Sequence, residues 1–254
     1  MKYSIGTLLI LTSVAQAAVL TVTPTADAYV RSDGDANGDD DTYNDINELI
    51  VGRVQGNEWI RPIMEFDLSG IDDGATINSV TLTMTVSTRD TSSTSNPLGA
   101  SGLQLFQMTT DADFTNKFTW NDQSWGGNQV NGGGDDTPWT TAGGDFSSTA
   151  LATIASVPLT SVNPGDTFTF ATGANFVNAI SGNLGDDTLQ LMLRTPSLES
   201  SFNERKLIRF ASESHSQTSY YPQLTIDYTP SPEPSSSAMF GLGVLMLAAR
   251  RKRN

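Results

Sequence analysis

Residues 80–87 alternate strictly between apolar and small polar side chains. Valine, leucine or methionine occupies every even position, and threonine or serine occupies the positions between them. Successive side chains of a strand point to opposite faces of a sheet, so this period predicts a strand with one buried and one solvated face. The buried face needs a second apolar layer to cover it, which constrains the chain to a layered β architecture.

The same two-residue period recurs along the chain between turn signals such as Asp73-Gly74 and Pro164-Gly165. Only residues 174–180 have helical spacing of apolar side chains. We therefore predict an all-β fold of about ten strands, a two-sheet antiparallel β-sandwich of jelly-roll type. Besides 80–87, the predicted strands centre on 20–22, 28–30, 49–51, 63–66, 103–105, 168–170, 189–193 and 224–228.

The start of the chain has the pattern of a secretory signal. Lys2 precedes an uncharged apolar run, and Ala15-Gln16-Ala17 places small residues at the positions that a signal peptidase reads. We expect a signal peptide over residues 1–18 and one folded domain over residues 19–229.

The end of the chain combines three features in a fixed order. Pro232-Glu233-Pro234 is followed by an uncharged apolar run over residues 238–249 and then by Arg250-Arg251-Lys252-Arg253. The prolines exclude regular structure because proline lacks an amide hydrogen. The apolar run has about the length of a short membrane-crossing helix, and the basic residues favour a cytoplasmic end. Residues 230–254 are therefore expected to form a terminal segment with a short transmembrane helix.

This order resembles the PEP-CTERM sorting signal of Gram-negative bacteria, with Pro232, Glu233 and Pro234 as the signal residues. The resemblance implies that an exosortase-type membrane transpeptidase handles the protein and that the C-terminal helix enters the inner membrane transiently. It also implies a final place at the cell surface or in the extracellular matrix. Such a signal indicates where the protein is located and says nothing about its biochemical activity.

The part between the two terminal segments is strongly acidic. The chain has 14 Lys+Arg and 28 Asp+Glu; without the five basic residues of the terminal segments the balance is 9 against 28, a net charge of −19 with Glu233 counted. Such a surface repels nucleic acid, so no nucleic-acid partner is expected, whereas it attracts divalent cations. The chain has no cysteine, so disulfides do not contribute to its stability.

An acidic run between two predicted strands suggests a calcium loop. Its first half, Asp33-Gly34-Asp35-Ala36-Asn37-Gly38, has oxygen ligands at alternate positions and a glycine at the turn. Asn44 stands where an EF-hand has its bidentate glutamate and no helices flank the run, so it is not an EF-hand. A Ca²⁺ loop between strands and a solvated acidic turn both remain open. The predicted ligands are Asp33, Asp35, Asn37, Asp39, Asp41 and Asp45.

Tryptophan and arginine side chains offer possible glycan contacts. Trp125 lies just before the glycine-rich stretch 126–144 and Trp139 lies near its end. An exposed indole stacks on the apolar face of a sugar ring. The other two, Trp59 and Trp120, are expected in the core. A basic cluster at 205–209, which includes Lys206, offers charge for acidic glycans. The predicted glycan-binding residues are Trp125, Trp139, Arg205 and Arg209.

Catalytic chemistry has little support, and we expect no enzyme. A serine triad would depend entirely on His215, the single histidine, which we expect in an exposed loop, and the chain has no Gly-x-Ser-x-Gly elbow. A glycosidase-type carboxylate pair stays open because carboxylate separation is invisible in a sequence. The candidates are Glu65, Glu199, Glu204 and Glu213, most of them surrounded by basic residues that would pair with them.

A series of short motifs follows the chain in order. They are Asp27-Ala28-Tyr29-Val30, Leu49-Ile50-Val51-Gly52, Arg61, Phe66-Asp67-Leu68, Ile77-Asn78-Ser79-Val80-Thr81-Leu82, Thr119-Trp120-Asn121, Phe210-Ala211-Ser212-Glu213 and Pro222-Gln223-Leu224-Thr225-Ile226-Asp227-Tyr228. Together they resemble the DNRLRE family of carbohydrate-binding-like β-sandwich domains in secreted bacterial and archaeal proteins. The resemblance implies a non-catalytic jelly roll, with Arg61 and Glu213 as structural partners inside it. Two features depart from the family, the acidic insertion at 32–45 and the segment 156–160, which stands in place of the family's Trp-Asp-Val-Thr-like strand. Loop-borne ligand specificity is therefore not transferred.

These features predict an exported, surface-sorted, non-catalytic domain that binds or organises extracellular polysaccharide, with calcium holding the acidic loop and bridging to acidic glycans. One alternative is a structural matrix or surface-layer protein with protein partners. A third is a polysaccharide lyase or hydrolase.

If the acidic loop holds calcium, removing the metal with EDTA should lower the melting temperature, because the clustered carboxylates then repel one another. Asp33→Ala combined with Asp35→Ala should abolish the difference between melting curves with and without EDTA. An unchanged curve for the natural chain on adding EDTA would refute the calcium assignment.

Overall fold

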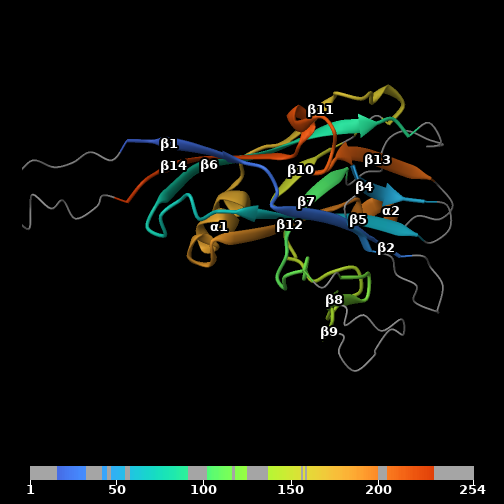
Figure 1. The fold of residues 1–254 in the computed structure, drawn as a ribbon, viewed down its shortest axis with the longest axis horizontal. Coiled ribbons are helices and arrows are strands. Elements are labelled where there is room, and N and C mark those ends of the chain that lie inside the picture. The colour runs from blue at the N-terminus through green and yellow to red at the C-terminus, as the bar shows by residue number, and fades with distance from the viewer. Residues whose placement is uncertain are drawn as a thin grey trace, which may run out of the picture.

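A computed structural model describes residues 16–32, 42–44, 47–54, 58–90, 102–115, 118–124, 137–155, 157, 159–199 and 205–231, with the backbone only at 42–44, 160 and 199. Within these ranges the chain is an all-β sandwich, as the alternation predicted (Figure 1). The strands are β1 (Ala18–Val22), β2 (Ala26–Arg31), β3 (Thr42–Asn44), β4 (Glu48–Arg53), β5 (Trp59–Asp67), β6 (Thr76–Thr88), β7 (Leu103–Gln107), β8 (Asp122–Ser124), β9 (Thr137–Pro138), β10 (Ala152–Ile154), β11 (Thr167–Phe170), β12 (Thr188–Arg194), β13 (Lys206–Ala211) and β14 (Gln223–Thr229). The helices are α1 (Ala174–Gly182), α2 (Pro196–Glu199) and the 3-10 turns Leu159–Ser161, Leu184–Asp186 and Thr218–Tyr220.

Twelve of the strands in the described residues form one antiparallel sheet that curls over on itself. Its order is β1-β14-β6-β13-β4-β5-β12-β7-β10, with β11 beside β6, β2 beside β5 and β3 beside β2. The longest strand, β6, has 13 residues and pairs with β14 along most of its length and with β13 at its end. This change of partner joins the two layers of the sandwich. The short strands β8 and β9 form a separate ladder.

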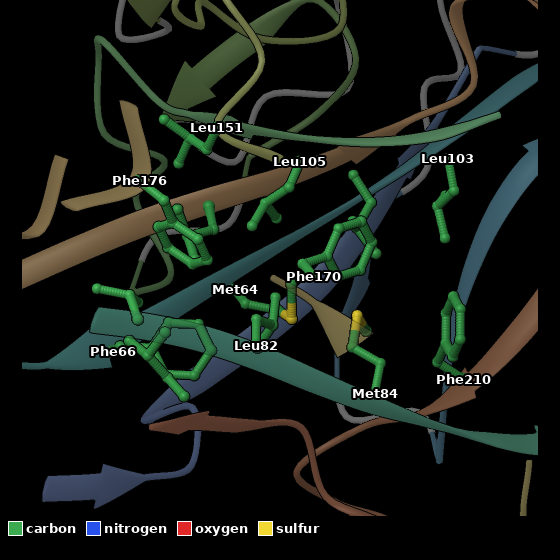
Figure 2. Packing of buried hydrophobic residues seen from close by; sticks show 14 of the residues in the cluster. Met64, Phe66, Leu82, Met84, Leu103, Leu105, Leu151, Phe170, Phe176 and Phe210 are labelled. Atoms are coloured by element: carbon green, nitrogen blue, oxygen red, sulfur yellow. The ribbon is translucent and has the colours of Figure 1, made fainter. Parts of the chain in front are cut away.

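The apolar face of β6 lies at the centre of the main core. All four of its even-numbered apolar residues from 80 to 86 are 0% exposed. Figure 2 shows Leu82 and Met84 among side chains of other elements, such as Met64 of β5, Leu105 of β7 and Phe170 of β11. The side chains that the two-residue period placed on one face therefore form the contact between the layers.

Strand β13 was not predicted, although it lies in the middle of the sheet between β6 and β4. Ile208 and Phe210 point into the main core, while Leu207 belongs to a small apolar cluster with Tyr29 and Ile50. Because both faces of β13 are buried, adjacent residues are apolar and the two-residue period disappears. Helix α1 confirms the one predicted helix.

The connection between β7 and β10 covers the outer face of the sheet and forms a second core. The ladder β8–β9 belongs to this excursion and lies below β5 and β12 in Figure 1. Aromatic residues of the excursion pack on apolar side chains of β2, β5 and β12. The cluster comprises Ala28, Val30, Ile63, Met108, Ala112, Phe118, Trp120, Trp139 and Met192.

The two ends of the described chain lie at the same end of the sandwich. Ala18 of β1 pairs with Tyr228 of β14, and Thr229 pairs with Thr76 at the start of β6. The opposite end of β6 is Thr88, about 40 Å away along the strand at about 3.3 Å per residue. In Figure 1, β1 and β14 accordingly extend to the left, whereas β4 and β13 lie toward the right.

Val80→Ala should lower the free energy of unfolding by about 2 kcal/mol, because it removes two buried methyl groups from the core and leaves a cavity. Val19→Ala is the matched control, since Val19 also lies in a strand but is 66% exposed. Urea denaturation of both variants measures the difference. Equal losses in the two variants would contradict the central place of the β6 face.

Candidate functional site

An open groove of about 450 Å³ lies at the Thr88 end of β6, away from the chain ends. Tyr29 and Ile50 are each only 7% exposed and form an apolar floor. The polar residues around them come from the start of β4 and the residue before it, the end of β6, β13 and the loop that follows β13. The full lining is Tyr29, Asn47, Glu48, Ile50, Thr88, Arg209 and His215.

Ion pairs connect the two predicted glycan-binding arginines at this groove. Arg209 Nη1 donates to Glu48 Oε2 at 2.8 Å, and Arg209 Nε lies 3.8 Å from Asp90 Oδ2. Arg205 Nη2 donates to the same Asp90 oxygen at 3.1 Å. The side chain of Asp90 is 3% exposed. Two arginines and two carboxylates therefore form one network in which the charges balance.

Glu48 is the ionised carboxylate of the groove. Burial acts to raise the pKa of Glu48, but hydrogen bonds from Thr88, Arg209 and Ser87, together with the Arg209 charge, outweigh burial and hold the pKa below its usual range. Ser87 Oγ donates to Oε1 at 2.9 Å, while Arg209 binds Oε2. The carboxylate is therefore held in one orientation from both sides.

The loop after β13 places His215, the only histidine of the chain, at the groove. The Gln217 amide donates to Nδ1 at 3.1 Å, and the ring stacks on Tyr220 with centroids 5.5 Å apart and planes 8° from parallel. Since Nδ1 accepts a hydrogen bond, the neutral ring has its proton on Nε2. The loop is also bound to β4 at its start, where the Ser212 amide donates to Asn47 O at 3.3 Å.

Asp27 anchors the same loop from below. Its Oδ2 accepts a hydrogen bond of 2.7 Å from the Glu213 amide. Burial raises the pKa of Asp27 from 3.8 to about 7; the Glu213 hydrogen bond opposes this shift and the Glu213 charge adds to it. Asp27 therefore titrates near neutral pH in the folded protein.

The sequence analysis predicted an exposed Trp139, but the structure shows this side chain to be buried. It is 6% exposed, and its Nε1 donates to Thr119 O at 3.0 Å inside the second core. The indole is fixed there because the Trp139 amide also donates to Asn121 O. No open indole face is presented at this position. Trp120 is 7% exposed, as predicted for a core residue, and stacks with the half-buried Trp59 at 6.2 Å.

Arg61 and Glu213 were expected to be structural partners inside the sandwich, but the structure places them in different contacts. The Arg61 guanidinium lies 4.5 Å from the centroid of Trp120 and donates to Gly143 O at 2.9 Å, under the excursion. Gly143 has φ +83°, and a Cβ there would lie 2.7 Å from the Trp120 ring. Only glycine permits this close packing, which explains one glycine of the glycine-rich stretch.

The remaining predicted residues lie outside the described residues. These are the calcium ligands Asp33, Asp35, Asn37, Asp39, Asp41 and Asp45, the glycan candidate Trp125, and the sorting residues Pro232, Glu233 and Pro234. The adjoining backbone is informative, because Val30 of β2 pairs with Thr42 of β3. Segment 33–41 thus connects two paired strands. Within the described ranges, no three Asp, Glu or His side chains are arranged to hold a metal ion.

Of the groove residues, the sequence had singled out Arg209 alone as a binding residue. Glu48 and Thr88 lie far from Arg209 in the chain, and only the pairing of β13 with both β4 and β6 brings them together. No local pattern indicates that register. His215 was expected in an exposed loop, and it is half-buried against Tyr220.

Asp27 predicts an unusual dependence of stability on pH. Its pKa is higher in the folded than in the unfolded state, so the folded state binds more protons between about pH 4 and 7. The free energy of unfolding should therefore fall across this window and level off above it. At roughly 1.4 kcal/mol per pKa unit, the loss amounts to a few kcal/mol.

Asp27→Asn should remove this loss and make the protein more stable than the natural chain at pH 8, as measured by urea denaturation at pH 5 and pH 8. Asp67→Asn is the control, because Asp67 is exposed and its pKa is lowered by hydrogen bonds from Ser69. If Asp27→Asn and Asp67→Asn show the same pH dependence, Asp27 does not titrate as described.

Comparison with known protein families matches residues 232–253 to the PEP-CTERM protein-sorting motif. No curated protein matches the chain. The matched region does not reach the sandwich, so the resemblance to the DNRLRE family stays a prediction. In the part of the chain that the structure describes, no helix is both long and apolar enough to cross a membrane; the predicted transmembrane run lies beyond it. The motif indicates a bacterial protein that is exported and sorted to the cell surface, and exosortase-type enzymes recognise such motifs.

Proposed function

We propose that this protein binds extracellular polysaccharide through the groove at β2, β4 and β13, without catalysing a reaction. The observation that supports this proposal is the composition of the groove, an apolar floor below a rim of amide, carboxylate, guanidinium and imidazole groups. A sugar ring has the matching chemistry, with C–H groups on its faces and hydroxyl groups at its edges. Glu48, Arg209 and His215 are oriented by hydrogen bonds before a ligand arrives, which lowers the entropic cost of binding.

The place of the groove agrees with a tethered protein. The chain leaves β14 at Thr229 and reaches the sorting motif within a few residues. The groove includes Thr88, at the other end of β6. A domain held at the bacterial surface by its C-terminal segment would therefore turn the groove toward the surroundings. We extend this to a Gram-negative cell, with transient insertion into the inner membrane and final residence at the surface or in the extracellular matrix.

We also propose that a calcium ion binds at the hairpin formed by β2 and β3. The acidic segment 33–41 joins these strands, and β2 also contributes Tyr29 to the groove. An ion bound by that segment would fix the hairpin beside the groove. It could also bridge to acidic glycans.

Catalysis is not proposed because the charged groups of the groove are engaged with one another. Glu48 is bound by Arg209 and Ser87, and Asp90 by both arginines. An acid and a base that act on a glycosidic bond must be able to exchange protons with the substrate.

A structural role with protein partners is the second candidate, and β1 favours it. This strand lies at the edge of the sheet, and its Val19 is 66% exposed. An edge strand has unpaired backbone groups that can extend a sheet into a neighbouring molecule.

Affinity electrophoresis of the full chain in gels that contain bacterial and plant polysaccharides tests the proposal. The natural protein should be retarded by at least one polymer, and Asn47→Ala combined with His215→Ala should reduce the affinity about tenfold, because two polar rim contacts are lost. Asn78→Ala is the control, since Asn78 donates to Asp227 on the opposite part of the sheet.

Retardation that survives in the double variant would show that glycans bind elsewhere. No retardation of the natural protein by any polymer would favour the structural role. New reducing ends or unsaturated sugars after incubation would contradict a non-catalytic protein.

A further inference from the structure

We infer that the groove selects neutral, hydroxyl-rich polysaccharides and rejects polyanionic ones, because Arg209, the arginine that lines it, is already paired with Glu48 and Asp90. This inference rests on the proposed function and names the class of ligand.

The first step is the charge of the network. Arg209 contacts both Glu48 and Asp90, and Arg205 contacts Asp90. An anionic sugar that took either arginine would have to displace a carboxylate. The Asp90 carboxylate is 3% exposed, so displacement would leave a buried charge without its partner. The sequence had suggested that this basic cluster receives acidic glycans, and the contacts argue against that use.

The second step concerns three other basic residues in the described part of the chain. Lys206, the third member of the cluster, is 7% exposed and Arg53 is 1% exposed. Arg31 is paired with Glu58. The part of the chain between the terminal segments has 27 acidic residues against 9 basic ones, so its overall field repels a polyanion as it approaches.

The third step concerns the hydrogen-bonding groups that the rim of the groove presents to a neutral sugar. A hydroxyl group both donates and accepts, so a sugar with neighbouring hydroxyls can donate to Glu48 and accept from Arg209 without separating them. The His215 ring adds an Nε2 donor, since its Nδ1 accepts from the Gln217 amide, and Asn47 adds an amide. Arg205 does not line the groove; it holds Asp90, which in turn positions Arg209. Arg205 is therefore a positioning residue.

The experiment compares neutral and anionic polymers for the full chain in mild detergent. Affinity electrophoresis is run in dextran, galactomannan and β-glucan gels and in alginate and polygalacturonate gels, at low and physiological salt. EDTA is present throughout, so that calcium cannot bridge two anions. The natural protein should bind at least one neutral polymer about tenfold or more tightly than either anionic polymer, and added salt should change the neutral binding little.

Glu48→Gln has nearly the same shape and leaves Arg209 with less compensating charge. It should weaken binding of the neutral polymer about tenfold, because a charged acceptor is lost, and should strengthen binding of the anionic polymers. Glu58→Gln is the matched control, since it makes the same change at a Glu–Arg pair that does not line the groove. It should leave both affinities unchanged.

A natural protein that prefers alginate or polygalacturonate in EDTA would overturn this inference while leaving polysaccharide binding intact. Unchanged affinities in Glu48→Gln would overturn it as well. Retention by no polymer would contradict both the inference and the proposed function. The comparison of polymers needs no variant, so the inference stays testable if Glu48→Gln fails to fold.

Discussion

Burial of one face of β6 is the contact on which the rest of the structure depends. The four apolar side chains at 80, 82, 84 and 86 are fully covered by the other layer, and the same strand exchanges β14 for β13 along its length. Because apolar burial is the main favourable term in folding, this face holds the layers together in a chain without disulfides. Its two ends then define the two ends of the molecule. One carries the chain termini, and the other carries the groove.

The groove is a product of long-range pairing. Register between β13 and β4 brings Arg209 to Glu48, and the end of β6 adds Ser87, Thr88 and, just beyond it, Asp90. Each of these charges is satisfied by another, so the site is rigid and nearly neutral within a strongly acidic protein. That combination favours a ligand that forms many hydrogen bonds without needing a net charge.

Sequence reasoning predicted the fold well where one face of a strand is buried and the other solvated, as in β6 and β14. It missed β13, because burial on both faces removes the alternation around Leu207 and Ile208. It placed Trp139 at the surface, because no local pattern shows that the excursion folds back onto β5 and β12. It named Arg209 but not Glu48, because the two side chains are brought together by the register of β13 and β4, which spacing in the chain does not reveal. The terminal sorting motif needs no tertiary context, and the family comparison confirms it.

His215 gives the most direct measurement of the central claim, because it is the only histidine and it lines the groove. Its imidazole proton resonance can be followed by NMR while a neutral oligosaccharide is added. A saturable shift of this resonance, with the same midpoint as binding measured by calorimetry, is the predicted result. Binding heat with an unmoved His215 resonance would place the sugar elsewhere and contradict the account.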